Sequence, residues 1–172
     1  MGVTAFPIVS GAQITANDTT AKMEPGTIMA YRTGDQWSLV EYVLLDNNGI
    51  SQGEVAIQNY ATIPAKQYSA AKAAVGDGGA PMKGVAAATI ASNRYGFLYV
   101  GGYCPIIDTS KSVVTGEYFR ISGSTAGKVT SLAASVFNAG TQGNASQFMV
   151  VAQAKTTFAT GTGSAQIIGV WG

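Results

Sequence analysis

The stretch "RYGFLYVGGYC", Arg94–Cys104, decides the fold of this chain. Successive side chains of a β-strand point to opposite faces. Phe97 and Tyr99 therefore share one face of the expected strand, whereas Leu98 and Val100 share the other. Both faces are apolar, which is typical of a strand that is covered on both sides. The second face needs a cover: a sheet partner within the same barrel, another copy of the protein, or a larger surface on which it sits.

Short β-prone runs separated by glycine occur along the whole chain, which has 22 Gly among 172 residues. This spacing predicts an all-β fold, a compact β-barrel or sandwich with at most one short helix. Turns are expected at Gly34-Asp35 and Asn48-Gly49, where positive φ angles suit the residues. The expected strands lie within residues 27–33, 37–45, 54–60, 83–91, 95–104, 116–122, 127–134, 148–155 and 165–172.

The chain is expected to divide into an arm and one domain. Residues 1–25 carry no charge before Asp18 and are predicted to form an extended N-terminal arm that docks against a partner. Residues 26–172 form a single β-rich domain, with a possible sub-boundary at the Gly76–Pro81 loop. The one plausible helix is Pro64–Val75, which Pro64 could open and Gly76 could end.

One short segment occurs twice. "ISQGEVAI", Ile50–Ile57, resembles "VVTGEYFR", Val113–Arg120, because each has an apolar residue, two spacers, Gly-Glu and then a strand. Gly53 and Gly116 are expected to adopt backbone conformations that other residues resist. The glutamates that follow them are expected at solvated strand mouths.

A longer segment is also repeated. Gly84–Tyr103 resembles Val150–Trp171 when a two-residue gap is allowed. Each begins with a V-A-x-A strand, continues through a loop of small residues, and ends in an apolar strand with a glycine near its aromatic end. Repeats of this kind fit a barrel or sandwich that is built from similar strand pairs.

The charge pattern excludes several classes of partner. Charged residues make up 11% of the chain and the net charge is +1, whereas charged residues usually make up about 25%. Because the sequence has no basic stripe, we expect no nucleic-acid binding. It has no run of about 18 apolar residues, so we expect no membrane span. The surface is either built from Ser, Thr, Asn, Gln and Gly or mostly covered by partners.

The residues for common catalytic and metal sites are few. The chain has no histidine, which excludes the usual Ser-His-Asp and Cys-His catalysis and His-based zinc sites. Cys104, the single cysteine, is expected to be buried and inert. Nothing in the spacing of the carboxylates requires them to pair as in a glycosidase. We therefore expect no enzyme, no cofactor and no metal. The carboxylates considered are Asp35, Glu41, Asp46, Glu54, Asp108 and Glu117.

The residues also carry a family resemblance. "YRTGDQWSLVEYVLLDNNGISQGEVAI", Tyr31–Ile57, looks like the opening of small phage virion proteins. Lys83–Leu132 is similar to the β-barrel of capsid decoration (cement) proteins of tailed bacteriophages, and Phe148–Gly172 resembles their closing strand–loop–strand. Here Thr, Ser and Gly replace the usual acidic loops, and Pro64–Pro81 has no counterpart.

The resemblance implies a structural role in the virion. Such proteins are made in the host cytoplasm, bind the capsid exterior, often as homotrimers, and clamp neighbouring major capsid subunits by adhesion. The expected partners are the major capsid protein and further copies of this chain. The expected arm contacts are Phe6, Pro7, Ile8 and Val9. The expected core or subunit-interface anchors are Trp37, Tyr42, Tyr99 and Trp171.

Three other functions stay open at the level of the sequence. The chain could be another virion component, such as a head–tail connector, tail or fibre-base protein. It could be a carbohydrate-binding or adhesin module, which would need exposed aromatic side chains with polar groups beside them. It could also be a glycosidase, if two of its carboxylates meet in space.

Overall fold

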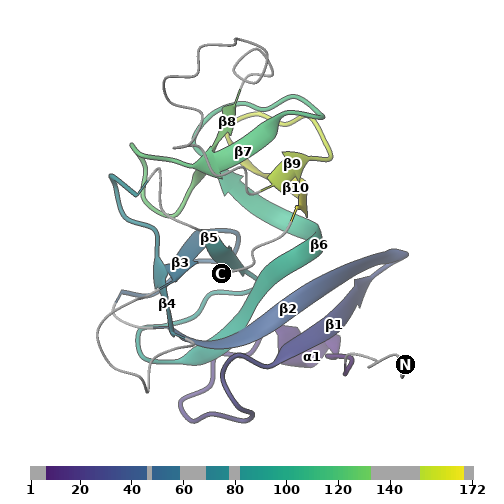
Figure 1. The fold of residues 1–172 in the computed structure, drawn as a ribbon, viewed down its shortest axis with the longest axis vertical. Helices are drawn as coiled ribbons and strands as arrows, with labels where there is room; N and C mark the ends of the chain where they lie inside the picture. Colours follow the sequence, from purple (N-terminus) through teal and green to yellow (C-terminus); the bar gives the residue numbers. More distant parts are fainter. Residues whose placement is uncertain (1–6, 46–47, 59–68, 78–81, 133–151, 169–172) are drawn as a thin grey trace, which may run out of the picture.

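The computed structural model describes residues 7–45, 48–58, 69–77, 82–132 and 152–168. The prediction of an all-β fold with at most one short helix is confirmed for these residues (Figure 1). The helix is α1 (Gly11–Ile14). The strands are β1 (Ile28–Thr33), β2 (Gln36–Leu45), β3 (Val55–Gln58), β4 (Ser69–Lys72), β5 (Met82–Ala86), β6 (Tyr95–Thr109), β7 (Tyr118–Ile121), β8 (Val129–Leu132), β9 (Ala152–Ala154) and β10 (Gly161–Ile167).

The strands close into two five-stranded barrels. In the first barrel the pairing runs from β2 through β4, β3, β5 and β6 and back to β2. In the second it runs from β6 through β10, β9, β7 and β8 and back to β6. The barrels lie one above the other and share the long strand β6 (Figure 1). Closure leaves these strands few unpaired edges.

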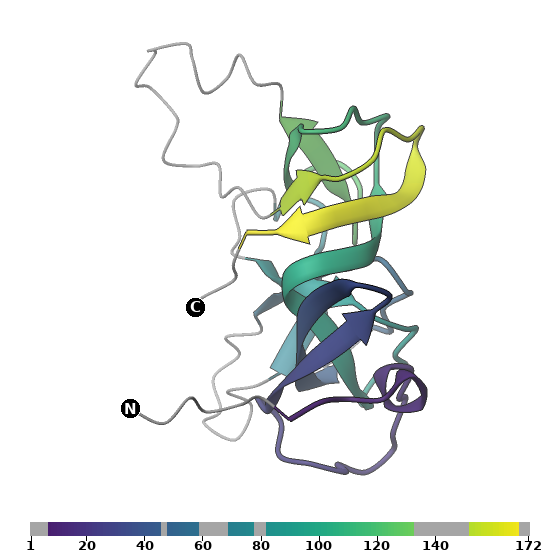
Figure 2. The same cartoon turned by 90° about the vertical axis from the view of Figure 1, so that its right-hand side faces the viewer.

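The shared strand changes barrels near its middle. Gly102 pairs with Ser38 of β2 on one side and with Ile167 of β10 on the other. Its φ is +73°, and a side-chain carbon there would lie 2.6 Å from the carbonyl oxygen of Trp37. Only glycine therefore fits this position. Figure 2 shows β6 winding from the lower barrel into the upper one.

Both apolar faces of β6 are covered within the same chain. Leu98 and Val100 lie in the core of the first barrel. Phe97 and Tyr99 pack on the other side, in the core that includes Tyr42. A sheet partner within the barrel is thus the cover that the sequence required. A second copy is not needed to cover this strand, because barrel closure buries Leu98 and Val100 while Phe97 and Tyr99 are buried on the outside of the barrel by other segments of the same chain.

The second barrel repeats the strand order of the first. In each circuit one neighbouring pair is parallel, β2 with β4 and β6 with β8, and the other four pairs are antiparallel. Thus β3 corresponds to β7, β4 to β8 and β5 to β9. The second half of β6 corresponds to β2, and β10 corresponds to the first half of β6. The match of Ile50–Ile57 with Val113–Arg120 therefore reflects a repeated structural unit. The match of Gly84–Tyr103 with Val150–Trp171 falls on corresponding strand pairs but in another register, because Ala86 corresponds to Ala154 in the structure and to Ala152 in the sequence match.

The turns before β3 and β7 are alike bond for bond. Gly53 and Gly116 have φ angles of +84° and +90°, as the sequence predicted. Gly53 donates its N–H to the carbonyl of Ala86 at 2.9 Å, and Gly116 donates to that of Ala154 at 3.0 Å. The Gly-Glu segment is therefore a turn in which only the glycine adopts the left-handed conformation.

The interiors correspond position by position. The residues in the core of the first barrel are Val43, Leu45, Ile50, Ala56, Ala70, Ala86, Ile90, Leu98 and Val100. Their counterparts in the second barrel are Ile107, Thr109, Val113, Phe119, Val129, Ala154, Phe158, Ala165 and Ile167. Phe119 replaces Ala56 and Ala165 replaces Leu98, so a different strand supplies the large side chain in each barrel. Such compensation keeps the core filled at similar volume.

Backbone hydrogen bonds join the two barrels along a seam. Asp108 donates its N–H to the carbonyl of Gly53 at 2.8 Å. Val55 donates to the carbonyl of Gly127 at 2.7 Å, and Gly127 donates to that of Ala73 at 2.8 Å. The second barrel is therefore hydrogen-bonded to the turn and strand ends of the first.

The prediction of a helix at Pro64–Val75 is wrong where the structure describes this segment. Residues 59–68 lie outside the described part, but Ser69–Lys72 forms β4. This strand pairs with β3 on one side and β2 on the other. Ser69 and Ala70 are buried there. Alanine has a high helix propensity, but propensity is a weak determinant, and sheet pairing in the closed barrel overrides it.

A sub-boundary was expected at the Gly76–Pro81 loop, which lies between β4 and β5 in the chain. Residues 78–81 of this loop lie outside the described residues. Both strands belong to the first barrel. The point where one barrel gives way to the other lies instead within β6. Chain order alone does not show this, because the two barrels share a strand.

Candidate functional site

The N-terminal segment packs on its own domain. Val9 donates its N–H to the carbonyl of Ala30 at 2.9 Å, and Ala30 donates to that of Pro7 at 2.8 Å. Val9 is buried, whereas Pro7 and Ile8 are exposed. Of the expected arm contacts, Val9 therefore belongs to the core. Phe6 lies outside the described residues.

The segment after Val9 also lies against the domain. Ser10 caps α1 in a capping box with Gln13. Ile14 is buried, and Asp18 pairs with Tyr95 of β6. An arm that reaches a neighbour along its whole expected length of 1–25 does not fit these contacts, since residues 7–18 already have partners within the chain.

Two of the expected aromatic anchors are core residues. Tyr42 is fully buried, stacks on Tyr95 at 5.8 Å between ring centroids, and packs against Phe97 at 5.1 Å. Its hydroxyl donates to Asp18 Oδ2 at 3.0 Å. Burial raises the pKa of Tyr42 to about 12. Tyr99 is also buried, which raises its pKa above the ordinary value. Neither ring can contact a partner.

Trp37 is the expected anchor that faces solvent, with 51% of its surface exposed. It lies near the tip of the hairpin formed by β1 and β2, which projects beyond the barrel (Figure 1). The guanidinium carbon of Arg32 lies 5.8 Å from the centre of its ring. This distance fits a cation–π contact. Trp171 lies outside the described residues.

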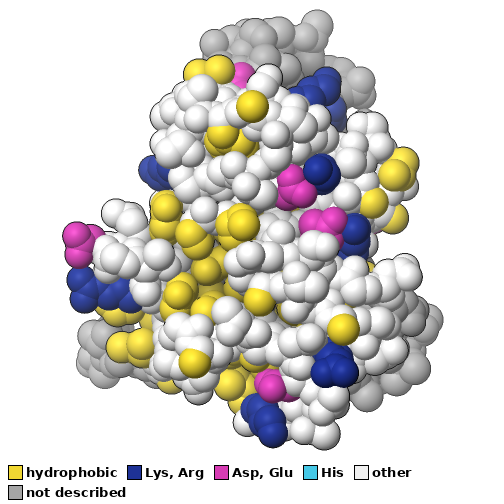
Figure 3. Space-filling model, turned by 180° about the vertical axis from the view of Figure 1, so that it is seen from behind, with side chains coloured by type: hydrophobic (Ala, Val, Ile, Leu, Met, Phe, Trp, Pro, Cys, Tyr) yellow, Lys and Arg dark blue, Asp and Glu magenta, His cyan; other side chains and the backbone are white. Residues whose placement is uncertain are grey.

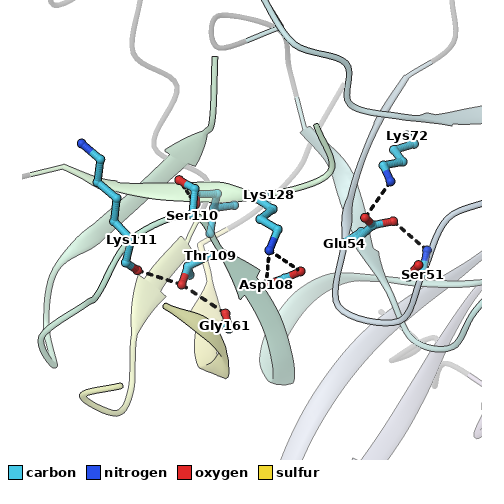
Figure 4. Close-up of polar contacts among 10 residues, drawn as sticks. Ser51, Glu54, Lys72, Asp108, Thr109, Ser110, Lys111, Lys128 and Gly161 are labelled. Carbon is cyan, nitrogen blue, oxygen red and sulfur yellow. Dashed lines mark hydrogen bonds and ion pairs between the residues drawn. The ribbon is translucent and has the colours of Figure 1, made fainter. Parts of the chain in front are cut away.

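Four of the six carboxylates considered for catalysis each form an ion pair with a cation of the same chain. Glu54 contacts Lys72 at 2.7 Å and Asp108 contacts Lys128 at 3.3 Å, close to the seam (Figure 4). Asp46 lies outside the described residues. The remaining ion pairs are Glu41–Lys83 at 2.6 Å and Asp35–Arg32 at 3.2 Å.

The burial of Glu54 differs from what the sequence predicted. The sequence placed it at a solvated strand mouth, but it is buried, at 8% exposure. Its second oxygen accepts the N–H of Ser51 at 2.7 Å (Figure 4). It is buried because the second barrel covers this turn. Its counterpart Glu117 accepts the N–H of Val114 at 3.0 Å and stays partly exposed.

Cys104 is buried, as the sequence predicted. Its thiol contacts the carbonyl oxygen of Ile106 at 3.0 Å. Burial raises the pKa of the thiol to about 12. Because the thiolate is the nucleophilic form, this cysteine is chemically inert near neutral pH.

The described residues contain neither a cluster of metal-ligating side chains nor a membrane-spanning helix. Among them, no group of three or more Cys, Asp or Glu side chains lies close enough together to hold a metal ion. No helix in this part of the chain is long and apolar enough to cross a membrane.

The surface has little charge and several exposed apolar side chains. Figure 3 shows hydrophobic side chains gathered in a band on the face opposite to that of Figure 1, with charged groups confined to isolated spots. The large hydrophobic residues that are most exposed are Ile8, Trp37, Val75, Val114 and Ile168.

No family model matches this chain, and a search of curated proteins found no match either. The candidate site therefore rests on its own geometry. The candidate site is the β1–β2 hairpin around Ile8 and Trp37. The sequence identified these two residues but not their neighbours on the same face, which are Ile28, Ala30 and Leu39. The available signal was that "TIMAYRT" and "WSLVEYVLL" are apolar on both faces.

Proposed function

We propose that this chain is a structural virion protein that decorates the outer surface of a tailed-phage capsid. It binds neighbouring major capsid subunits and stabilises the lattice by adhesion, without catalysis. The observation that carries the proposal is a pair of fused barrels with little net charge that displays large apolar side chains such as Trp37 and Ile8.

The charges support an adhesive role. The chain has ten Lys and Arg and nine Asp and Glu residues. The four ion pairs described above engage eight of these charges within the chain. Among the described residues, most exposed positions are Ser, Thr, Asn, Gln or Gly. Such a surface forms a polar rim around apolar anchors, which is the usual anatomy of a protein interface.

The double barrel also suits a repetitive lattice. Its seam holds the two barrels in a fixed relation, so a capsid-bound copy can touch two neighbouring subunits without ordering a linker. Many identical weak contacts on one shell add up through multivalency. The expected partners remain the major capsid protein and further copies of this chain, as a homotrimer.

The test is binding to capsids assembled without this chain. The purified protein is added to such capsids, and bound protein is measured by sedimentation while capsid melting is followed by calorimetry. We expect saturable binding and a higher capsid melting temperature. An unaltered melting temperature with no bound protein would overturn the proposal. Binding at one vertex only would assign the chain to the connector or tail instead.

A further inference from the structure

One face of the β1–β2 hairpin carries several apolar side chains, and its tip projects beyond the first barrel (Figure 1). Register places its residues together: Ile8 pairs with Ala30, and Ala30 pairs with Leu39. Arg32 pairs with Trp37 in the same hairpin. Paired residues, and residues two apart along a strand, share a face. We call this surface the hairpin outer face, and its apolar members are Ile8, Ile28, Ala30, Trp37 and Leu39.

The two faces of the hairpin have different surroundings. On the inner face, Met29 and Val40 are buried in the core. On the outer face, Ile8 is 66% exposed and Trp37 is 51% exposed. Ile28 and Ala30 are half-buried, and Leu39 packs against the core of the first barrel, so Ile8 and Trp37 are the members that face solvent. A hairpin that has apolar residues on both faces, of which only one face is fully covered, presents either a binding surface or an aggregation hazard.

The charges on the outer face indicate the chemistry of the partner. Arg32 is paired with Asp35 at the tip, and Glu41 is paired with Lys83 at the inner end. Each cation on the face is thus matched by an anion from the same chain. A strongly charged partner would have to compete with these pairs, whereas a neutral apolar surface would not.

A second copy of this chain meets that requirement. Its outer face is equally neutral and apolar, and the net charge of +1 gives little repulsion between copies. Arg32 and Asp35 lie side by side at the exposed tip, so a facing copy presents an anion near each cation. We infer that the hairpin outer face is the surface through which copies of this chain associate.

This inference rests on the proposed function for the role of self-association, but its test uses no capsid. The molar mass of the purified chain is measured by light scattering and sedimentation velocity over a wide range of concentration. Trp37→Ser is expected to raise the dissociation constant at least about thirtyfold, as truncation of a central aromatic anchor does. Ile8→Ser is expected to weaken association in the same direction.

The matched control is Val114→Ser, a comparably exposed apolar residue, at 58%, on the second barrel. It is expected to change the dissociation constant by less than about twofold. Circular dichroism verifies folding, and Ile8→Ser answers the question if Trp37→Ser does not fold. A wild-type monomer at every concentration, or oligomers that persist in both hairpin variants, would overturn the inference. A monomer that still binds capsids would refute the inference and leave the proposed function standing.

Discussion

The turns Ile50–Glu54 and Val113–Glu117 have the same backbone and different surroundings. In the first barrel, a side-chain carbon at Gly53 would lie 3.1 Å from Ile106, and the carbonyl of Gly53 accepts the N–H of Asp108. In the second barrel, nothing lies within 4 Å of such a carbon at Gly116. We call the first turn the joint, because the second barrel packs against it, and the second turn the exposed end, because the space around Gly116 is open.

The exposed end is adapted to water. The carbonyl of Gly116 accepts a hydrogen bond from the Gln153 side chain at 3.1 Å. The residue that corresponds to Gln153 in the first barrel is Val85, which is fully buried. The glycine carbonyl thus accepts a hydrogen bond from a side chain, that of Gln153, in the second barrel, and from a backbone N–H, that of Asp108, in the first. Terminal units of repeat proteins are capped in the same way.

The largest loss of stability is expected from a substitution that crowds the contact between the joint and the second barrel. Gly127 has a φ of +72°, and an added carbon would lie 2.8 Å from Lys72 Cε and 2.9 Å from Glu54 Oε1. Gly127→Ala is therefore expected to lower the free energy of unfolding by about 2–4 kcal/mol, from backbone strain plus overpacking. Chemical denaturation measures it.

Gly116→Ala is the matched control for Gly127→Ala. Its φ of +90° carries the same kind of backbone strain but its surroundings are open. The expected loss is about 1–2 kcal/mol, from conformation alone. Equal losses in the two variants would mean that the seam contributes nothing to stability, and the comparison of the two turns would fail.

The next effect depends on pH. Cys104 pairs with Ala165, and Glu41 pairs with Leu98 at the corresponding place in the first barrel. The first barrel thus has a paired carboxylate where the second has a neutral thiol. The Cys104 pKa is raised from 9.0 to about 12 by burial. Between these values the unfolded thiol ionises while the folded thiol stays protonated, so stability falls as the pH rises.

The measurement compares the wild type with Cys104→Ala at two pH values. Between about pH 8 and about pH 10.5, the wild type is expected to lose about 2 kcal/mol more than the variant. Tyrosines contribute equally to both proteins and cancel in this difference. An identical pH dependence in both proteins would show that the thiol is accessible to water in the folded state.

The smallest effect concerns the two glutamates. Glu54→Gln leaves the part-buried Lys72 without its counter-ion, and we expect a loss of about 1–2 kcal/mol. Glu117→Gln keeps an oxygen that can accept the N–H of Val114, so its loss should stay below about 0.5 kcal/mol. Thermal denaturation of the two variants provides the comparison. A larger loss for Glu117→Gln would reverse our assignment of joint and end.

The local features of the fold were predictable from the sequence. The turn at Gly34 and the positive φ of Asn48 follow from the preferences of these residues. The two-sided apolar pattern of Phe97–Val100 correctly indicated a strand that is covered on both faces. The resemblance between Ile50–Ile57 and Val113–Arg120 correctly indicated a repeated unit. These features depend on a few neighbouring residues, which is why sequence alone reveals them.

The candidate site was only partly predictable. Exposure of Trp37 and burial of Tyr42 look alike in a sequence, because both are aromatic residues of one strand, β2. The two lie on opposite sides of the strand and in different halves of it. Only the tertiary structure shows that the start of β2 projects beyond the barrel with β1, where Trp37 is exposed.

The sequence by itself determined that the chain is all-β, that it repeats a unit and that its cysteine is buried. Composition, glycine spacing and side-chain alternation are local quantities that carry this information. The tertiary structure decided that the alanine-rich segment is β4, that two barrels share β6, and that Glu54 is buried while Glu117 is not. These outcomes depend on contacts between segments far apart in the chain, whose energies outweigh local propensity.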